Sequence, residues 1–140
     1  MQTSSRFTFA IHTLTMLAMT EGKNVPSDFI AESAKTNPVV IRRIMLLLKK
    51  AGLIKSQQGV HGGAVLLRKP ENITLLDIYK AVEYKNVFSL HPNIPNPQCI
   101  VGRNIQNILG DIFNNAENAM ESVLAGISIA QIKNTIHDKV

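Results

Sequence analysis

The chain has 140 residues, 45% of them hydrophobic, which suits one medium-sized domain or a small domain with an appended element. Its net charge of +5 is unevenly distributed. Residues 1–69 carry ten basic and three acidic residues (+7), whereas residues 70–140 carry five basic and seven acidic residues (−2). This distribution is typical of a polyanion-binding head on a weakly acidic body. The single cysteine, Cys99, excludes an intramolecular disulfide and favours a reducing, cytoplasmic environment.

The first predicted element is a helix over about residues 4–21. Its apolar residues recur at helical spacing and form one stripe: Phe7, Ile11, Leu14 and Ala18. Polar residues such as His12 interrupt the apolar run, and no convincing cleavage site follows it, so we interpret it as a packed helix rather than a signal peptide. The sequence contains no run long and apolar enough to span a membrane.

Residues 27–35 and 38–51 are predicted to form two short helices joined by a tight turn. Ser27 is expected to be the N-cap of the first helix and Asn37 that of the second, with Pro38 in its first turn. Three apolar residues of the first helix are expected on one face: Phe29, Ile30 and Ala34. An apolar stripe of the second helix consists of Val40, Ile41, Ile44, Leu47 and Leu48. The pattern predicts a helix-turn-helix whose second helix presents its cations to the major groove.

A glycine-rich hairpin is predicted directly after the second helix. Residues 53–56 and 64–67 are short β-type runs, and three glycines lie within the five positions 59–63 between them. Glycine supplies the positive-φ geometry of tight turns and lets a backbone approach another surface closely. A hairpin at this place is typical of the wing in winged helix-turn-helix proteins, with its tip against phosphates or in the minor groove.

The residues expected to contact DNA lie before the second helix, on its outer face and in the wing. They are Thr36, Asn37, Val39, Arg42, Arg43, Lys49, Ser56, Gln57, Gln58, Gly59 and His61. For His61, a phosphate contact and an exposed turn position both agree with the sequence. An ordinary amphipathic helix pair with a surface hairpin is the alternative, but the order of helix, turn, charged helix and wing is more specific.

The remaining chain is predicted to divide into a helix, a linker and a long helix. Residues 74–84 complete a DNA-binding domain over residues 1–84. Three prolines within residues 85–99 forbid a regular helix and predict a stiff linker. Residues 100–125 are predicted to form one helix about 40 Å long, followed by a short final helix. The dimerisation helix and the C-terminal helix together form the third expected segment, residues 100–140.

An apolar stripe runs along the predicted long helix. Its members lie three or four residues apart: Val101, Ile105, Ile108, Ile112, Ala116, Ala119 and Val123. Because a winged head of this size is too small to cover the stripe, we expect it to pack against its two-fold mate or to cross onto the partner's head. Burial in the chain's own core is the alternative.

The chain resembles the Rrf2 family of bacterial winged helix-turn-helix regulators in three successive blocks: RFTFAIHTLTMLA, FIAESAKTNPVVIRRIMLLLKKAGLIKSQQGVHGGAVLL and ITLLDIYKAVE. The resemblance covers nearly the whole chain and is strongest over residues 6–83. It implies a homodimeric transcription factor, usually a repressor, that binds a palindromic operator. Many members sense a signal through an iron–sulfur cluster held by three cysteines between the fourth helix and the long helix.

The sequence departs from this family pattern at two places. Cys99 stands alone, so a three-cysteine iron–sulfur site cannot be assembled within one protomer, and the chain resembles the cysteine-poor, YwnA-like branch. We therefore expect no cofactor and no metal site, while Cys99 is either a candidate sensor of oxidants or electrophiles or an inert side chain. Gln58 stands where many relatives have an arginine, so one phosphate or minor-groove contact is expected to be weaker or to be supplied by His61 instead.

These features predict a mainly α protein: a winged helix-turn-helix head with a small two-stranded β wing and a long C-terminal dimerisation helix. The predicted function is a cytoplasmic transcriptional regulator, a homodimeric repressor with residues 38–51 in the major groove of an operator and residues 57–63 on its backbone or minor groove. A protein-interaction module that uses the long helix without sequence-specific DNA binding is the alternative. An enzyme is not expected, because GVHGG lacks the setting of a nucleotide-binding loop and no catalytic set is suggested by spacing.

Overall fold

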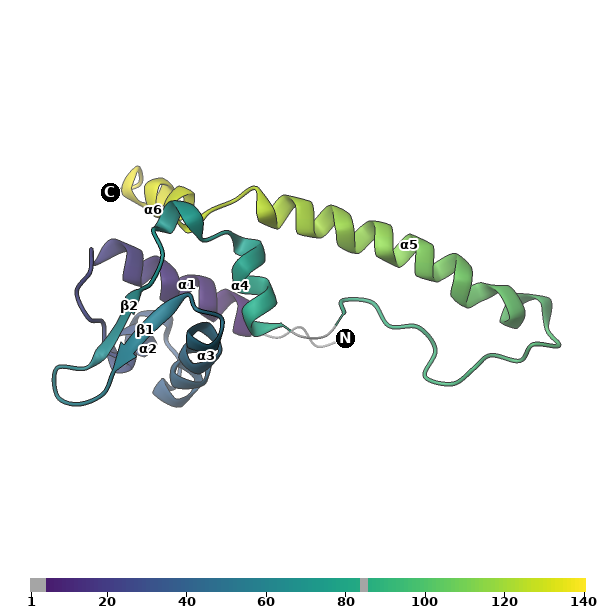
Figure 1. Cartoon of the computed structure of the whole chain (residues 1–140), viewed down its shortest axis with the longest axis horizontal. Coiled ribbons are helices and arrows are strands. Elements are labelled where there is room, and N and C mark those ends of the chain that lie inside the picture. Colours follow the sequence, from purple (N-terminus) through teal and green to yellow (C-terminus); the bar gives the residue numbers. More distant parts are fainter. Residues whose placement is uncertain (1–4, 84–85) are drawn as a thin grey trace. The chain divides into compact units, whose positions relative to one another are not determined.

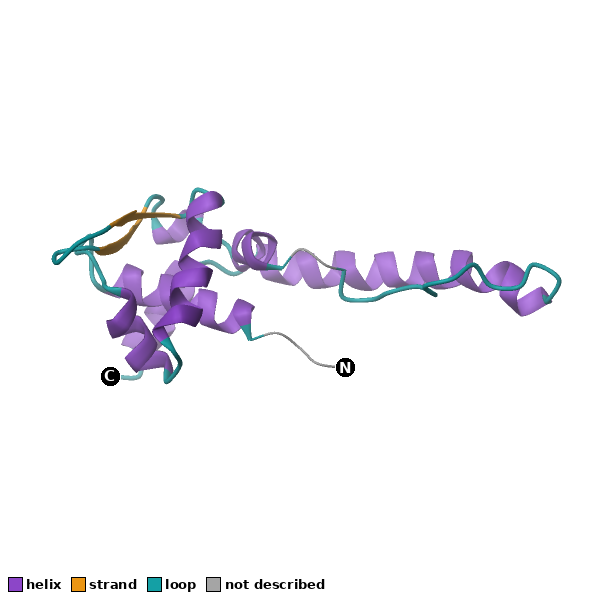
Figure 2. Cartoon of the chain, turned by 90° about the horizontal axis from the view of Figure 1, so that it is seen from below, coloured by secondary structure: helices purple, strands orange, loops and turns teal. Residues whose placement is uncertain are grey.

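The computed structural model describes residues 5–83 and 86–140 of the chain. The chain divides into two compact units: a head made of Met1–Tyr84 and Leu124–Val140, and a second unit made of Lys85–Val123. Helices dominate both units, and the strands of the described residues lie in the head (Figure 1; Figure 2). The prediction of a mainly α fold with a small two-stranded sheet is confirmed.

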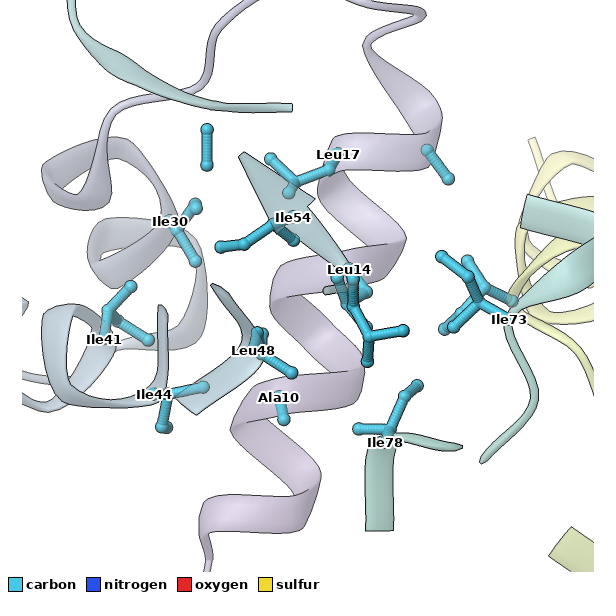
Figure 3. Close-up of a cluster of buried hydrophobic side chains, with 14 of the residues drawn as sticks. Ala10, Leu14, Leu17, Ile30, Ile41, Ile44, Leu48, Ile54, Ile73 and Ile78 are labelled. Carbon is cyan, nitrogen blue, oxygen red and sulfur yellow. The ribbon is translucent and has the colours of Figure 1, made fainter. Parts of the chain in front are cut away.

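Three helices build the base of the head: α1 (Arg6–Met19), α2 (Ser27–Ala34) and α3 (Pro38–Lys50). Figure 3 shows Ala10 and Leu14 of α1 at the centre of the core, between side chains of α2 and α3 on one side and Ile73 and Ile78 on the other. All four of these residues are fully buried. Burial of such aliphatic side chains is the main force that holds the three helices together.

The wing is an antiparallel hairpin of β1 (Ile54–Gln57) and β2 (Gly63–Leu66), paired from Ile54 with Leu66 to Gln57 with Gly63. The backbone of Val25 joins it through two hydrogen bonds with Ala64, of 3.1 and 3.0 Å. These bonds fasten the hairpin, one residue pair from its loop, to the segment before α2, and the residues between the strands form its tip.

A 3-10 turn, η1 (Pro70–Asn72), leads from the wing into α4 (Leu75–Val82). A reciprocal capping box starts α4: the Thr74 side chain accepts a hydrogen bond from the Asp77 N–H, and the Asp77 carboxylate accepts one from the Thr74 N–H. An ion pair of 3.2 Å between Arg6 and Glu83 joins the start of α1 to the end of α4. Figure 3 shows Ile78 of α4 on the side of the core away from α2.

The short final helix α6 (Ile129–His137) belongs to the head. Ile129 is fully buried, its N–H donates to the carbonyl of Ile73 at 2.9 Å, and the Leu75 N–H donates to the carbonyl of Ile127 at 2.9 Å. Residues 100–140 were expected to form one segment, but α6 lies in the head and α5 as far as Val123 lies in the second unit. The reason is packing, because α6 rests on α1 and η1 and completes their core.

The second unit contains the linker and most of α5 (Ile100–Ala125), a helix of 26 residues, or about 40 Å. None of the residues of α5 is buried. The predicted stripe is exposed except for half-buried Ile105, and the linker residue Phe88 stacks on Phe113 beside it with ring centroids 4.9 Å apart. No helix within the described ranges is both long and apolar enough to cross a membrane.

Candidate nucleic-acid interface

The turn between α2 and α3 is defined by caps at both of its ends. Lys35 ends α2 in the left-handed conformation, with φ 55° and ψ 49°. The Asn37 side chain accepts a hydrogen bond from the Val39 N–H at 2.9 Å, and Pro38 occupies the first turn of α3. The predicted cap and helix break are confirmed, and they fix the residue at which α3 begins.

The outer surface of α3 carries the predicted contact residues. The buried residues of the helix share one face: Ile41, Ile44 and Leu48. The predicted contact residues on and before the helix are exposed, apart from half-buried Thr36: Asn37, Val39, Arg42, Arg43 and Lys49. The core therefore anchors one side of the helix and leaves the opposite side free to meet a ligand.

Arg42 is held against the start of α2. Its Nη2 lies 3.2 Å from Asp28 Oδ1, and its Nε donates to Ser27 Oγ at 3.3 Å. The expected capping role of Ser27 is wrong, because Pro26 takes the N-cap position and Ser27 bonds Arg42 instead. Both charged side chains are mostly exposed, so the pair contributes little to stability and mainly orients the guanidinium. Among the described residues, Arg43 has no hydrogen-bond or ion-pair partner.

Two glycines shape the wing, one in its tip and one at the start of β2. Gly59 has a φ of +108°, which side chains rarely tolerate, and a Cβ at Gly63 would lie 2.7 Å from the backbone of Val25. The predicted use of glycine for turn geometry and close approach is confirmed. Asn24 steadies the tip, because its amide nitrogen lies 3.5 Å from both the Gln57 side chain and the carbonyl of His61. The His61 side chain is exposed.

A groove of about 500 Å³ lies between the start of α2, α3 and the wing. It brings six of the predicted contact residues together: Arg42, Lys49, Ser56, Gln57, Gln58 and Gly59. The other predicted residues lie outside its lining: Thr36, Asn37, Val39, Arg43 and His61. Two cations, two amides and exposed backbone are the groups that bind a phosphodiester strand.

Two further residues at this interface were not predicted from the sequence: Leu46 and Asn24. Leu46 is 60% exposed and lines the groove. It follows Val39 by seven residues, or about two helical turns, and this spacing was the available signal. The role of Asn24 depends on the contact between a loop and the wing more than thirty positions away, for which the sequence holds no local signal.

A family model described as "Rrf2: Iron-dependent Transcriptional regulator" matches residues 3–135. The chain belongs to the Rrf2 family. YwnA of Bacillus subtilis strain 168, named as an HTH-type transcriptional regulator, is 44% identical over 132 residues, which cover 94% of this chain and 96% of YwnA. YffB of Lactococcus lactis subsp. lactis strain IL1403, named in the same way, is 24% identical and covers 94% of this chain and 86% of its own.

Solved structures share the fold of this chain. A crystal structure described as that of a DNA-binding protein has 41% identity and a TM-score of 0.74, and covers 91% of this chain and 98% of its own. IscR of T. potens, 22% identical with a TM-score of 0.73, covers 97% of this chain and 88% of its own, and supports the fold alone. The matching family model and the named relatives make this Rrf2 protein a helix-turn-helix transcriptional regulator rather than an enzyme.

The iron in the family description does not fit the residues of this Rrf2 protein. The sequence contains one cysteine, and within residues 5–83 and 86–140 no three His, Cys, Asp or Glu side chains form a metal-ligand group. Cys99 is exposed at the start of α5. Hydrogen bonds from the backbone N–H groups of Gly102 and Val101 lower the pKa of its thiol.

Proposed function

We propose that this Rrf2 protein is a cytoplasmic repressor that binds a palindromic operator as a homodimer. The observation that carries the proposal is the surface formed by α3 and the wing, where Arg42 and Lys49 share a groove with the wing amides. The net charge of +7 over residues 1–69 supports a polyanionic partner.

The shape of this surface supports docking on DNA through both α3 and the wing. The N-terminal part of α3 enters the major groove, and wing residues 57–63 lie on the phosphate backbone or in the minor groove. Arg42 or Arg43 reads guanine through a bidentate contact, worth about 1–3 kcal/mol of discrimination. Lys49, Gln57 and Gln58 contact phosphates across the groove, and these contacts position the head.

The apolar stripe of α5 supports the dimer. Exposed Ile108, Ile112 and Val123 lie on one line of a helix that buries no residue. A second copy of the same helix would remove this line from water. Two linked heads can then occupy half-sites separated by about 34–36 Å, which accounts for a palindromic operator.

Footprinting of the purified protein on the region upstream of its own gene tests the function. We expect a protected palindrome and a gel shift that weakens as salt rises, since phosphate contacts release counterions. At least one of Arg42→Ala and Arg43→Ala should lose operator binding while remaining folded. Arg103→Ala on α5 removes the same charge and should bind normally. Wild-type binding by both α3 variants would show that the assigned helix is wrong.

The regulator is further proposed to work without an iron–sulfur cluster, because one cysteine per chain supplies too few ligands. The signal is then either a chemical modification of Cys99 or a small molecule that binds beside the linker, residues 85–99. Protein purified without oxygen should lack visible absorbance and stoichiometric iron. A coloured, iron-containing protein would overturn this part of the proposal.

A further inference from the structure

The centre of the outward face of α3 is hydrocarbon. Val39 is 43% exposed and Leu46 is 60% exposed. Seven residues at about 100° each bring them within about 20° of one line along the helix. That line lies opposite the buried face of the helix: Ile41, Ile44 and Leu48. The part of α3 that points directly away from the core is therefore apolar.

Two rows of cations border this apolar line. At about 100° per residue, Arg42 and Lys49 fall on one side of it, and Arg43 and Lys50 fall on the other. The first row lines the groove beside the wing, where Asp28 holds Arg42. The major groove of DNA is about 12 Å wide and has a phosphate strand on each wall. The rows suit the two sides of this groove, where an arginine can reach a phosphate or a neighbouring guanine, and the apolar line then lies over the base edges between them.

The helix lacks the side chains that read adenine or cytosine. The thirteen residues of α3, PVVIRRIMLLLKK, include no Asn, Gln, Asp or Glu. Amides recognise adenine and carboxylates recognise cytosine in the major groove, whereas apolar groups contact the 5-methyl group of thymine. The amide of Asn37, just before the helix, already caps it through its oxygen. Thymine is thus the base whose groove edge matches an apolar line.

We infer that Val39 and Leu46 read the 5-methyl groups of thymines in each operator half-site. The inference rests on the proposed docking of α3 in the major groove and adds the base chemistry beneath it. A single exposed leucine is ordinary on a protein surface. Here, two exposed aliphatic side chains occupy the middle of a cationic surface, and DNA binding would remove both from water.

The test uses duplexes selected by the full-length protein from a randomised pool. Each thymine of the selected half-site is replaced in turn by deoxyuridine, which removes only the methyl group, and dissociation constants are measured at one salt concentration. At one or more positions, wild-type protein should bind the deoxyuridine duplex about fourfold more weakly, as expected for one buried methyl group. The penalty should disappear in Val39→Ala or Leu46→Ala.

Leu67→Ala is the matched control, because Leu67 is 54% exposed and lies outside α3. This variant should keep the thymine preference of the wild type. Equal binding of thymine and deoxyuridine duplexes at every position would overturn the inference, as would a preference that persists in both α3 variants. Failure of the protein to enrich or shift any duplex would instead overturn the proposed function and this inference with it.

Discussion

Asp28 is an acidic residue within a surface proposed to bind a polyanion. Its side chain is 75% exposed and pairs with Arg42 at 3.2 Å. Asp28→Asn keeps an acceptor for Arg42 but removes the negative charge, so we expect severalfold tighter binding to random duplex DNA and a steeper salt dependence. The free energy of unfolding should change by less than about 1 kcal/mol, because the pair is exposed.

Fluorescence anisotropy across a salt series measures the effect of Asp28→Asn. Asp138→Asn, near the end of the chain, makes the same charge change on an exposed residue and is the control. Weaker binding by Asp28→Asn than by this control would contradict the prediction. It would mean that the carboxylate matters more for orienting Arg42 than for repelling phosphate.

The thiol of Cys99 should react as a thiolate at lower pH than an ordinary cysteine. Backbone N–H groups of Gly102 and Val101 hydrogen-bond the anion in the folded chain, so the pKa of the thiol falls below its usual value. The alkylation rate with iodoacetamide should therefore rise at lower pH in native protein than in the same chain unfolded in urea. Coinciding pH profiles in the two states would rule out this effect of the helix start.

Local chemistry explains which residue roles were predictable. Asn37 was correctly assigned as a cap because its partner, the Val39 N–H, lies two residues away. Ser27 was wrongly assigned because its partner, Arg42, lies on another helix. Phe29 was expected to share one face of α2 with Ile30, but Phe29 is 54% exposed whereas Ile30 is fully buried in the core.

At the scale of elements, α6 should contribute to the stability of the head. Ile129 is fully buried, whereas Ile136 on the same helix is 40% exposed. Ile129→Ala should lower the free energy of unfolding by about 2–5 kcal/mol, because it removes buried methyl groups and leaves a cavity. Ile136→Ala should cost clearly less, and urea denaturation monitored by circular dichroism compares the two. Equal losses would contradict the packing of α6 into the core.

Periodicity predicted the elements well and their partners less well. The helices, the wing and the length of α5 follow from apolar spacing, glycines and prolines, which act locally. The position of α6 does not follow from its sequence, because an apolar face shows that a helix packs against something but does not identify the element it contacts. Its attachment depends on backbone hydrogen bonds from Leu75 to Ile127 and from Ile129 to Ile73, which join segments more than fifty residues apart.

At the scale of the whole molecule, the long helix α5 has more apolar surface than its own unit covers. The linker contributes Phe88, which stacks on Phe113 at one side of the stripe. Ile108, Ile112 and Val123 remain 54–63% exposed. Large exposed apolar stripes of this kind are typical of protein interfaces, and a symmetric helix pair would cover this one.

Charges placed in this stripe should therefore separate the protomers. In the double variant Ile112→Asp, Val123→Asp, each helix would carry unpaired carboxylates into an apolar seam, at a cost on the order of several kcal/mol. Asn114→Asp adds a carboxylate about 200° around the same helix and should remain dimeric. Sedimentation should show the double variant as monomer or aggregate, and its affinity for a palindromic operator should fall towards that for a single half-site, because the heads are no longer linked. A double variant that stays dimeric and binds the palindrome like the Asn114→Asp control would exclude α5 as the dimer interface.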